Sequence, residues 1–124
     1  MEPRVLIVED DLASMQLLWL TLEGAGYRLD AATTRRDALH LVRSTDYQAA
    51  VLDIGLPELD GARLAREIRS HPVTAALPLV AVSAHALGEE IKRACEAGID
   101  LYLTKPVGLV ALRRAVERVI REHA

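Results

Sequence analysis

Acidic side chains follow directly after two apolar runs of this 124-residue chain. The acids are Glu9, Asp10 and Asp11 after residues 5–8, and Asp53 after residues 49–52. Short apolar runs of this kind are typical of buried parallel strands. The carboxyl ends of such strands meet at one edge of the sheet, where open α/β folds bind their ligands. We therefore expect the carboxylates to converge there and, because they repel one another, to share a cation such as Mg²⁺, which prefers oxygen ligands.

Two further polar residues end later apolar runs in the same way. Ser83 follows residues 79–82, and Lys105 follows residues 101–104. At the same edge of a sheet they would add a hydroxyl group and an ammonium group to the acids. An acid pair, a separate acid, a hydroxyl and a lysine together indicate phosphoryl chemistry on a carboxylate.

Strand-like and helix-like patterns alternate five times along the chain, and this alternation would create the required sheet edge. The strand-like runs are residues 5–8, 28–32, 49–52, 79–82 and 101–103. Apolar residues at helical spacing occupy residues 12–24, 35–43, 62–70, 88–97 and 109–122. Five strand–helix units with short connections predict an α/β fold: a flavodoxin-like, doubly wound, five-stranded parallel sheet in the order 2-1-3-4-5, with five helices on two faces.

Length and composition favour one domain spanning residues 1–124. Apolar residues make up 51% of the chain and aromatic residues 3%, so the core is expected to consist of Leu, Val, Ile and Ala. A net charge of −3 without a basic run excludes the usual signature of nucleic-acid binding. No apolar stretch approaches the ~20 residues that span a bilayer, and the first strand leaves no room for a signal peptide, so a cytoplasmic location is expected. Cys95 is expected in the core, on the apolar face of its helix.

The residues at these strand ends resemble the receiver domain of two-component response regulators. The matching segments are residues 7–11 (IVEDD), 52–57 (LDIGLP), 60–61 (DG), 82–84 (VSA) and 104–106 (TKP). Each segment alone is a weak signal, but all of them in order, each at the end of a predicted strand, are specific. Leu56 stands where Met is common in the family and Ser83 where Thr is common, and both replacements keep the chemistry.

The resemblance implies a role for each residue of the predicted site. Asp53 would be the phosphoacceptor, and Lys105, preceding a cis bond to Pro106, would pair with Asp53 at rest and with a phosphoryl oxygen afterwards. Mg²⁺ would bind Asp10 directly, Glu9 mainly through water, Asp53 itself, and the backbone carbonyl of Gly55. Ser83 would hydrogen-bond the phosphoryl group, and Tyr102 stands where the family commonly has an aromatic residue that rotates upon activation.

Several of these residues also have a purely structural interpretation. Asp11 is better explained as the N-cap of the first helix than as a metal ligand. Asp53 could cap a turn, Lys105 could be a surface lysine, and Tyr102 could be a half-buried strand residue with its hydroxyl in water.

The function predicted from the resemblance is that of a phosphoacceptor response regulator in His-Asp signalling, not an enzyme in its own right. Its phosphoryl donor would be a sensor histidine kinase or a histidine phosphotransfer protein, and phosphorylation of Asp53 would switch binding to a downstream protein target. One alternative is a receiver excised from a hybrid kinase or a longer regulator, and another is a docking module that is never phosphorylated. A phosphatase with an Asp nucleophile is disfavoured because Gly55 stands where a second acid is needed, and a flavin carrier because acids occupy its phosphate loop.

The first predicted helix contains more apolar residues than one buried face can hold. They are Leu12, Met15, Leu17, Leu18, Trp19, Leu20 and Leu22. Some of them should therefore face solvent beside the acids and form a docking surface for the phosphoryl donor.

Overall fold

The computed structural model describes residues 2–54, 60–84 and 88–123, and in them strands and helices alternate. The strands are β1 (Arg4–Val8), β2 (Arg28–Ala32), β3 (Ala49–Asp53), β4 (Leu79–Ser83) and β5 (Leu101–Thr104). The helices are α1 (Leu12–Glu23), α2 (Arg35–Ser44), α3 (Gly61–Ser70), α4 (Gly88–Glu96) and α5 (Leu109–Glu122).

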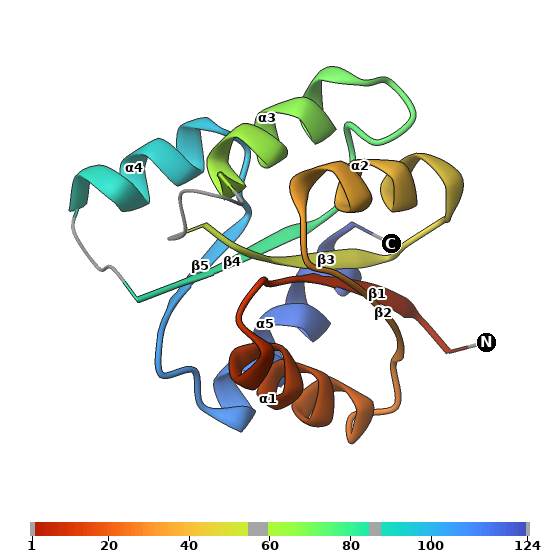
Figure 1. Ribbon diagram of the computed structural model, residues 1–124, viewed down its shortest axis with the longest axis vertical. Coiled ribbons are helices and arrows are strands. Elements are labelled where there is room, and N and C mark those ends of the chain that lie inside the picture. Colours follow the sequence, from red (N-terminus) through yellow and green to blue (C-terminus); the bar gives the residue numbers. More distant parts are fainter. Residues whose placement is uncertain (1, 55–59, 85–87, 124) are drawn as a thin grey trace.

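The strands form one parallel sheet in the order β2-β1-β3-β4-β5, which confirms the predicted topology. Helices α1 and α5 cover one face of this sheet, and α2, α3 and α4 cover the other (Figure 1). This arrangement is the one expected when each crossover between parallel strands is right-handed. Among the described residues, no helix is both long enough and apolar enough to cross a membrane.

Two apolar clusters fill the space between the sheet and its helices. Alternate residues of a strand point to opposite faces, so Leu6 packs towards α2, α3 and α4 while Val5 and Ile7 pack towards α1 and α5. The central strands are buried on both faces, which explains why their sequences are continuously apolar and do not alternate with polar residues.

The strands end at or directly before the residues predicted to form the site. Both β3 and β4 extend one residue beyond the apolar run, so that Asp53 and Ser83 are their last residues. These positions place the two side chains at the carboxyl edge of the sheet, within its regular hydrogen-bonded structure.

Helix α3 begins in close contact with the end of β3. A Cβ atom on Gly61 would lie 2.7 Å from the carbonyl oxygen of Asp53, so only glycine fits there. The preceding Asp60 has a φ of 43° and caps the helix by accepting a hydrogen bond from the backbone N–H of Arg63, at 3.2 Å. The Asp-Gly pair thus allows the chain to turn directly beside the candidate site.

The expectation that Cys95 lies in the core is wrong, because its side chain is exposed. Helix α4 packs through Ala94, which is buried. Cys95 is the next residue, about 100° further around the helix, and therefore points away from the sheet.

Candidate functional site

Four of the predicted residues lie at the ends of neighbouring strands. They are Glu9 after β1, Asp53 on β3, Ser83 on β4 and Lys105 after β5. Backbone hydrogen bonds continue just beyond the strands, from the N–H of Glu9 to the carbonyl of Ala32 (3.1 Å) and from the N–H of Lys105 to the carbonyl of Ser83 (2.7 Å). These bonds hold the backbone of both residues at the edge of the sheet. Rigid elements of this kind position functional side chains better than free loops do.

Lys105 joins two buried carboxylates. Its Nζ lies 2.7 Å from Oε1 of Glu9 and 2.9 Å from Oδ2 of Asp53. The Glu9 and Asp53 side chains are 0% and 3% exposed, so bulk water screens these ion pairs poorly. The interpretation of Lys105 as a free surface lysine is therefore excluded.

The pKa of Lys105 depends on its two acidic partners, Glu9 and Asp53. Burial by itself lowers the pKa of Lys105, but the hydrogen bonds and charges of Glu9 and Asp53 outweigh burial and raise its pKa above the ordinary value. Lys105 therefore remains an ammonium ion at neutral pH and compensates part of the negative charge of the acids.

The expected convergence of the acids requires a correction. Across residues 2–54, 60–84 and 88–123, no group of three or more His, Cys, Asp or Glu side chains lies close enough together to hold a metal ion. Asp10 is exposed, whereas Glu9 and Asp53 are linked by the lysine. Lys105 thus relieves the repulsion between the two buried acids: its predicted pairing with Asp53 is observed, and it pairs with Glu9 as well.

Glu9 is an unusual carboxyl group. Burial, together with the hydrogen bond and negative charge of Asp53, raises the pKa of Glu9 from 4.5 to about 7, against the opposing effect of Lys105. Its second oxygen, Oε2, is buried and has no hydrogen-bond partner among the described residues. A buried acceptor without a partner costs stability unless a proton, a water or a cation binds it.

We expect the unfolding free energy in the presence of a chelator to fall by about 1–2 kcal/mol as the pH rises from about 5 to about 8. Because the pKa of Glu9 is higher in the folded state than in the unfolded chain, its contribution to stability is complete at low pH and is lost as the carboxyl ionises at about pH 7. Denaturant unfolding across this range would measure it. Glu9→Gln should flatten the profile, and Glu96→Gln, at an exposed position on α4, should not. Equal slopes for wild type and Glu9→Gln would contradict the prediction.

The structural interpretation of Asp11 is confirmed. Asp11 is the N-cap of α1, and its Oδ2 accepts a hydrogen bond of 2.9 Å from the backbone N–H of Ser14. The peptide bond between Lys105 and Pro106 is cis, as the resemblance implies. Gly55, whose carbonyl was predicted as a metal ligand, lies outside the described residues.

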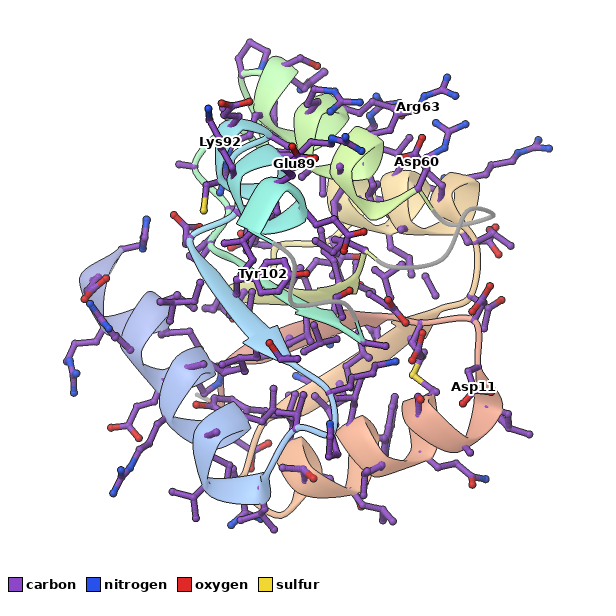
Figure 2. All side chains as sticks on the ribbon, turned by 90° about the vertical axis from the view of Figure 1, so that its left-hand side faces the viewer. Asp11, Asp60, Arg63, Glu89, Lys92 and Tyr102 are labelled. Atoms are coloured by element: carbon purple, nitrogen blue, oxygen red, sulfur yellow. The ribbon has the colours of Figure 1, made fainter. Side chains whose placement is uncertain are left out.

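Ser83 and Tyr102 lie on neighbouring strands and line a common pocket. Ser83 is buried at the end of β4, and Tyr102 is half-buried on β5. The pocket has a volume of about 390 Å³ and is also bounded by α3 and α4, through residues such as Arg66 and Arg93. Figure 2 shows Tyr102 beside the sheet below α4, with Asp60 at the start of α3. The geometry therefore connects the serine of the site to the predicted switch residue.

Ser14 also belongs to the site, although its sequence pattern did not predict it. Its Oγ lies 3.4 Å from Nζ of Lys105, although the two residues are 91 positions apart. The signal in the sequence was its position three residues after the N-cap Asp11, in the first helical turn beside the acids. That position alone does not show which side chain the hydroxyl meets.

The fold and this site together define a class of protein: a doubly wound parallel α/β domain with buried acids and a lysine at the carboxyl edge of its sheet. The chain belongs to the response regulator receiver domain family, whose model matches residues 5–117. It is a receiver domain of two-component signalling.

Similar proteins of known sequence and structure support this assignment. The sensor histidine kinase RcsC of Salmonella typhi is 36% identical over 97% of this chain, which spans only 13% of the length of RcsC. A putative response regulator from Chloroflexus aurantiacus has a TM-score of 0.93 and 31% identity, with 98% of this chain and 99% of that chain covered. The receiver domain of the sensor histidine kinase PA1611 from Pseudomonas aeruginosa has a TM-score of 0.90 and 30% identity, covers 98% and 99% of the two chains, and holds a magnesium ion in its active site cleft.

Proposed function

We propose that Asp53 accepts a phosphoryl group in a reaction that depends on Mg²⁺, and that this event switches binding to a protein partner. The observation that carries the proposal is the position of Asp53: a buried carboxylate at the carboxyl edge of the sheet, held by Lys105 at 2.9 Å. A carboxylate in this position can act as a nucleophile, and the lysine beside it can pair with a phosphoryl oxygen after transfer.

The residues present are suited to Mg²⁺. Oε2 of Glu9, which has no hydrogen-bond partner in residues 2–54, 60–84 and 88–123, and the exposed carboxylate of Asp10 offer oxygen ligands next to each other in sequence. Mg²⁺ usually keeps several waters and needs few protein ligands, so the absence of a group of three clustered acids among the described residues is compatible with binding. Asp10 and Asp53, with the Gly55 carbonyl, would hold the ion directly, and Glu9 would contact it mainly through water. Bound there, Mg²⁺ would neutralise charge on the phosphoryl oxygens.

Two further side chains of the site would bind the phosphoryl group after transfer. Lys105 would exchange its bond with Asp53 for one with the phosphoryl group, and the Ser83 hydroxyl would donate a hydrogen bond to that group. The chain would assist its own phosphorylation and dephosphorylation without acting on a separate substrate, so we propose a phosphoacceptor and not an enzyme.

The proposal is tested by incubating the protein with Mg²⁺ and either acetyl phosphate or phosphoramidate, and measuring the intact mass. We expect a gain of one phosphoryl group that requires Mg²⁺ and is lost when the acyl phosphate is hydrolysed in alkali. An unchanged mass with both donors would instead support the receiver-like docking module, the second candidate. A receiver belonging to a longer protein would give the same result as an independent one, and the small share of RcsC that this chain spans is compatible with either.

The proposed phosphoryl donor is a histidine kinase or a histidine phosphotransfer protein that docks on α1. Three of the apolar residues of this helix are exposed, as predicted: Leu12 at 73%, Leu17 at 59% and Leu20 at 64%. Met15, Leu18 and Leu22 are buried against the sheet instead. The exposed leucines form a surface, which we call the α1 patch, on the helix that begins beside the acids.

We expect Leu20→Glu to lower phosphotransfer from a cognate phosphohistidine protein about 10-fold, because a charge in an apolar contact is desolvated upon docking. Phosphorylation by acetyl phosphate should be unchanged, since that donor needs no docking surface. Val73→Glu is the matched control, because Val73 is 77% exposed and lies between α3 and β4, away from the α1 patch. Radiolabelled transfer assays with both donors would measure these effects. An equal loss with both donors would contradict docking on α1.

We further expect phosphorylation to change the surface formed by α4, β5 and α5. Ser83 moving towards a phosphoryl group would free space in the pocket that it shares with Tyr102, and Tyr102 could rotate into that space. Amide chemical shifts with and without beryllofluoride should therefore change around Tyr102 as well as Asp53. Ser83→Ala should still accept phosphate but lose the change at Tyr102. Shifts confined to the neighbourhood of Asp53 in the wild type would contradict this switch.

A further inference from the structure

Lys105 has a third neighbour besides the two acids. The hydroxyl oxygen of Ser14 lies 3.4 Å from its Nζ, on the first turn of α1. An ammonium group has three hydrogens to donate, and the described part of the chain provides three acceptors: Oε1 of Glu9, Oδ2 of Asp53 and Oγ of Ser14. Ser14 is the acceptor that carries no charge.

The position of Ser14 is fixed by its own backbone. Its N–H donates to Oδ2 of the N-cap Asp11 at 2.9 Å, so the first turn of α1 is tied down at this residue. The side chain therefore faces Lys105 from a rigid element and not from a loop. A neutral acceptor on a rigid helix can keep its contact when the acids change their charge.

The Ser14 hydroxyl lies between two charged groups, since it also hydrogen-bonds the Asp11 carboxylate, and its oxygen can accept from Lys105. Ser14 and Lys105 line the same cavity of about 350 Å³ between α1 and the segment that follows β5, together with apolar residues such as Leu17, Leu18 and Val107. Thr21 supplies a second hydroxyl to this wall, but that hydroxyl donates to the carbonyl of Leu17 at 2.8 Å.

We propose that Ser14 is a positioning residue that keeps the ammonium of Lys105 directed at the site while its bond to Asp53 is exchanged for one to the phosphoryl group. This inference rests on the proposed function of Asp53 and extends it to a residue of α1. At rest the two acids hold Lys105 strongly. During transfer the Asp53 carboxylate becomes an acyl phosphate, and the contact with Ser14 limits the loss of order in the long lysine side chain.

The first test compares initial rates of phosphorylation by acetyl phosphate at saturating Mg²⁺. We expect Ser14→Ala to be about 3- to 10-fold slower than the wild type, because the loss of one neutral hydrogen bond has an effect of this size. Ser14→Thr keeps the hydroxyl and should react within about twofold of the wild type. Ser44→Ala is the matched control, since the Ser44 hydroxyl donates to the carbonyl of His40 at the end of α2.

The second test does not depend on phosphorylation. The chain has two lysines, Lys92 and Lys105, so selective ¹³C and ¹⁵N labelling of lysine gives two sets of side-chain signals. Lys92 lies exposed on α4 and serves as the internal reference (Figure 2). Ser14→Ala should move the Lys105 signals and leave those of Lys92 in place, and Ser14→Thr should move them less.

The outcomes separate this inference from the proposed function. If the wild type accepts no phosphate, the proposed function fails, whatever the lysine signals show. If the wild type is phosphorylated, the role of Ser14 is overturned by any of three results: a Ser14→Ala rate within twofold of the wild type, unmoved Lys105 signals in that variant, or a Ser14→Thr variant as slow as Ser14→Ala. The combination of a slow Ala variant, a restored Thr variant and moved Lys105 signals supports it.

Discussion

Asp53→Asn is expected to reduce phosphorylation by acetyl phosphate by ~10²-fold or more, to below detection by intact mass. The amide of Asn is a far weaker nucleophile than a carboxylate, and no described acid other than Glu9 shares the buried position beside Lys105. Glu9 is a poor substitute because burial and Asp53, against the opposing effect of Lys105, raise its pKa to about 7, so that it is only partly ionised at neutral pH. Intact-mass measurement over a time course with Mg²⁺ would determine the loss.

The matched control for this variant is Asp11→Asn. Asp11 is exposed and serves as the N-cap of α1, and Asn caps helices about as well as Asp. This variant should be phosphorylated at a rate within about twofold of the wild type. If Asp53→Asn still gained a phosphoryl group at the normal rate, another side chain would be the acceptor, and peptide mapping of the modified residue would identify it.

Lys105→Met is expected to lower the unfolding free energy by about 2–4 kcal/mol near pH 8 in the presence of a chelator, because it leaves two buried carboxylates facing each other without their cation. Met is an unbranched side chain only one atom shorter than Lys, so the change in unfolding free energy arises mainly from the lost charge. The loss should be smaller near pH 5, since the raised pKa of Glu9 allows one of the acids to be neutral there. Mg²⁺ should restore part of the stability. Denaturant unfolding at both pH values would measure these differences.

Two variants make the prediction for Lys105 specific. Lys92→Met removes the other lysine, which is exposed on α4, and should change the unfolding free energy by less than about 0.5 kcal/mol. Asp53→Asn in the Lys105→Met background should recover much of the lost stability, because it removes one of the two repelling charges. A Lys105→Met variant as stable as the wild type at both pH values would show that the ion pairs contribute nothing to folding.

The architecture of this protein could be predicted from its amino-acid sequence. The alternation of short apolar runs with helical periodicity predicted five strand–helix units, and chain connectivity restricted them to a doubly wound parallel sheet. The same reasoning located Asp53, Ser83 and Lys105, because a residue that follows a buried strand lies at the edge of the sheet whatever the details of packing. Asp11 was also predictable, since helix capping depends on residues close together in the chain.

The pairing of these residues could not be predicted from the sequence, because it depends on how distant elements pack. The end of a strand determines where a side chain is attached to the sheet. Which charged group that side chain contacts depends on residues far away in the sequence. Glu9 and Lys105 are 96 positions apart, and their contact at 2.7 Å follows from the placement of β1 and β5 on either side of β3 and β4. The same packing leaves Asp10 in solvent and brings the Ser14 hydroxyl to Lys105. Local patterns cannot encode such contacts, because they arise when separate elements dock on a common sheet and share the space at its edge.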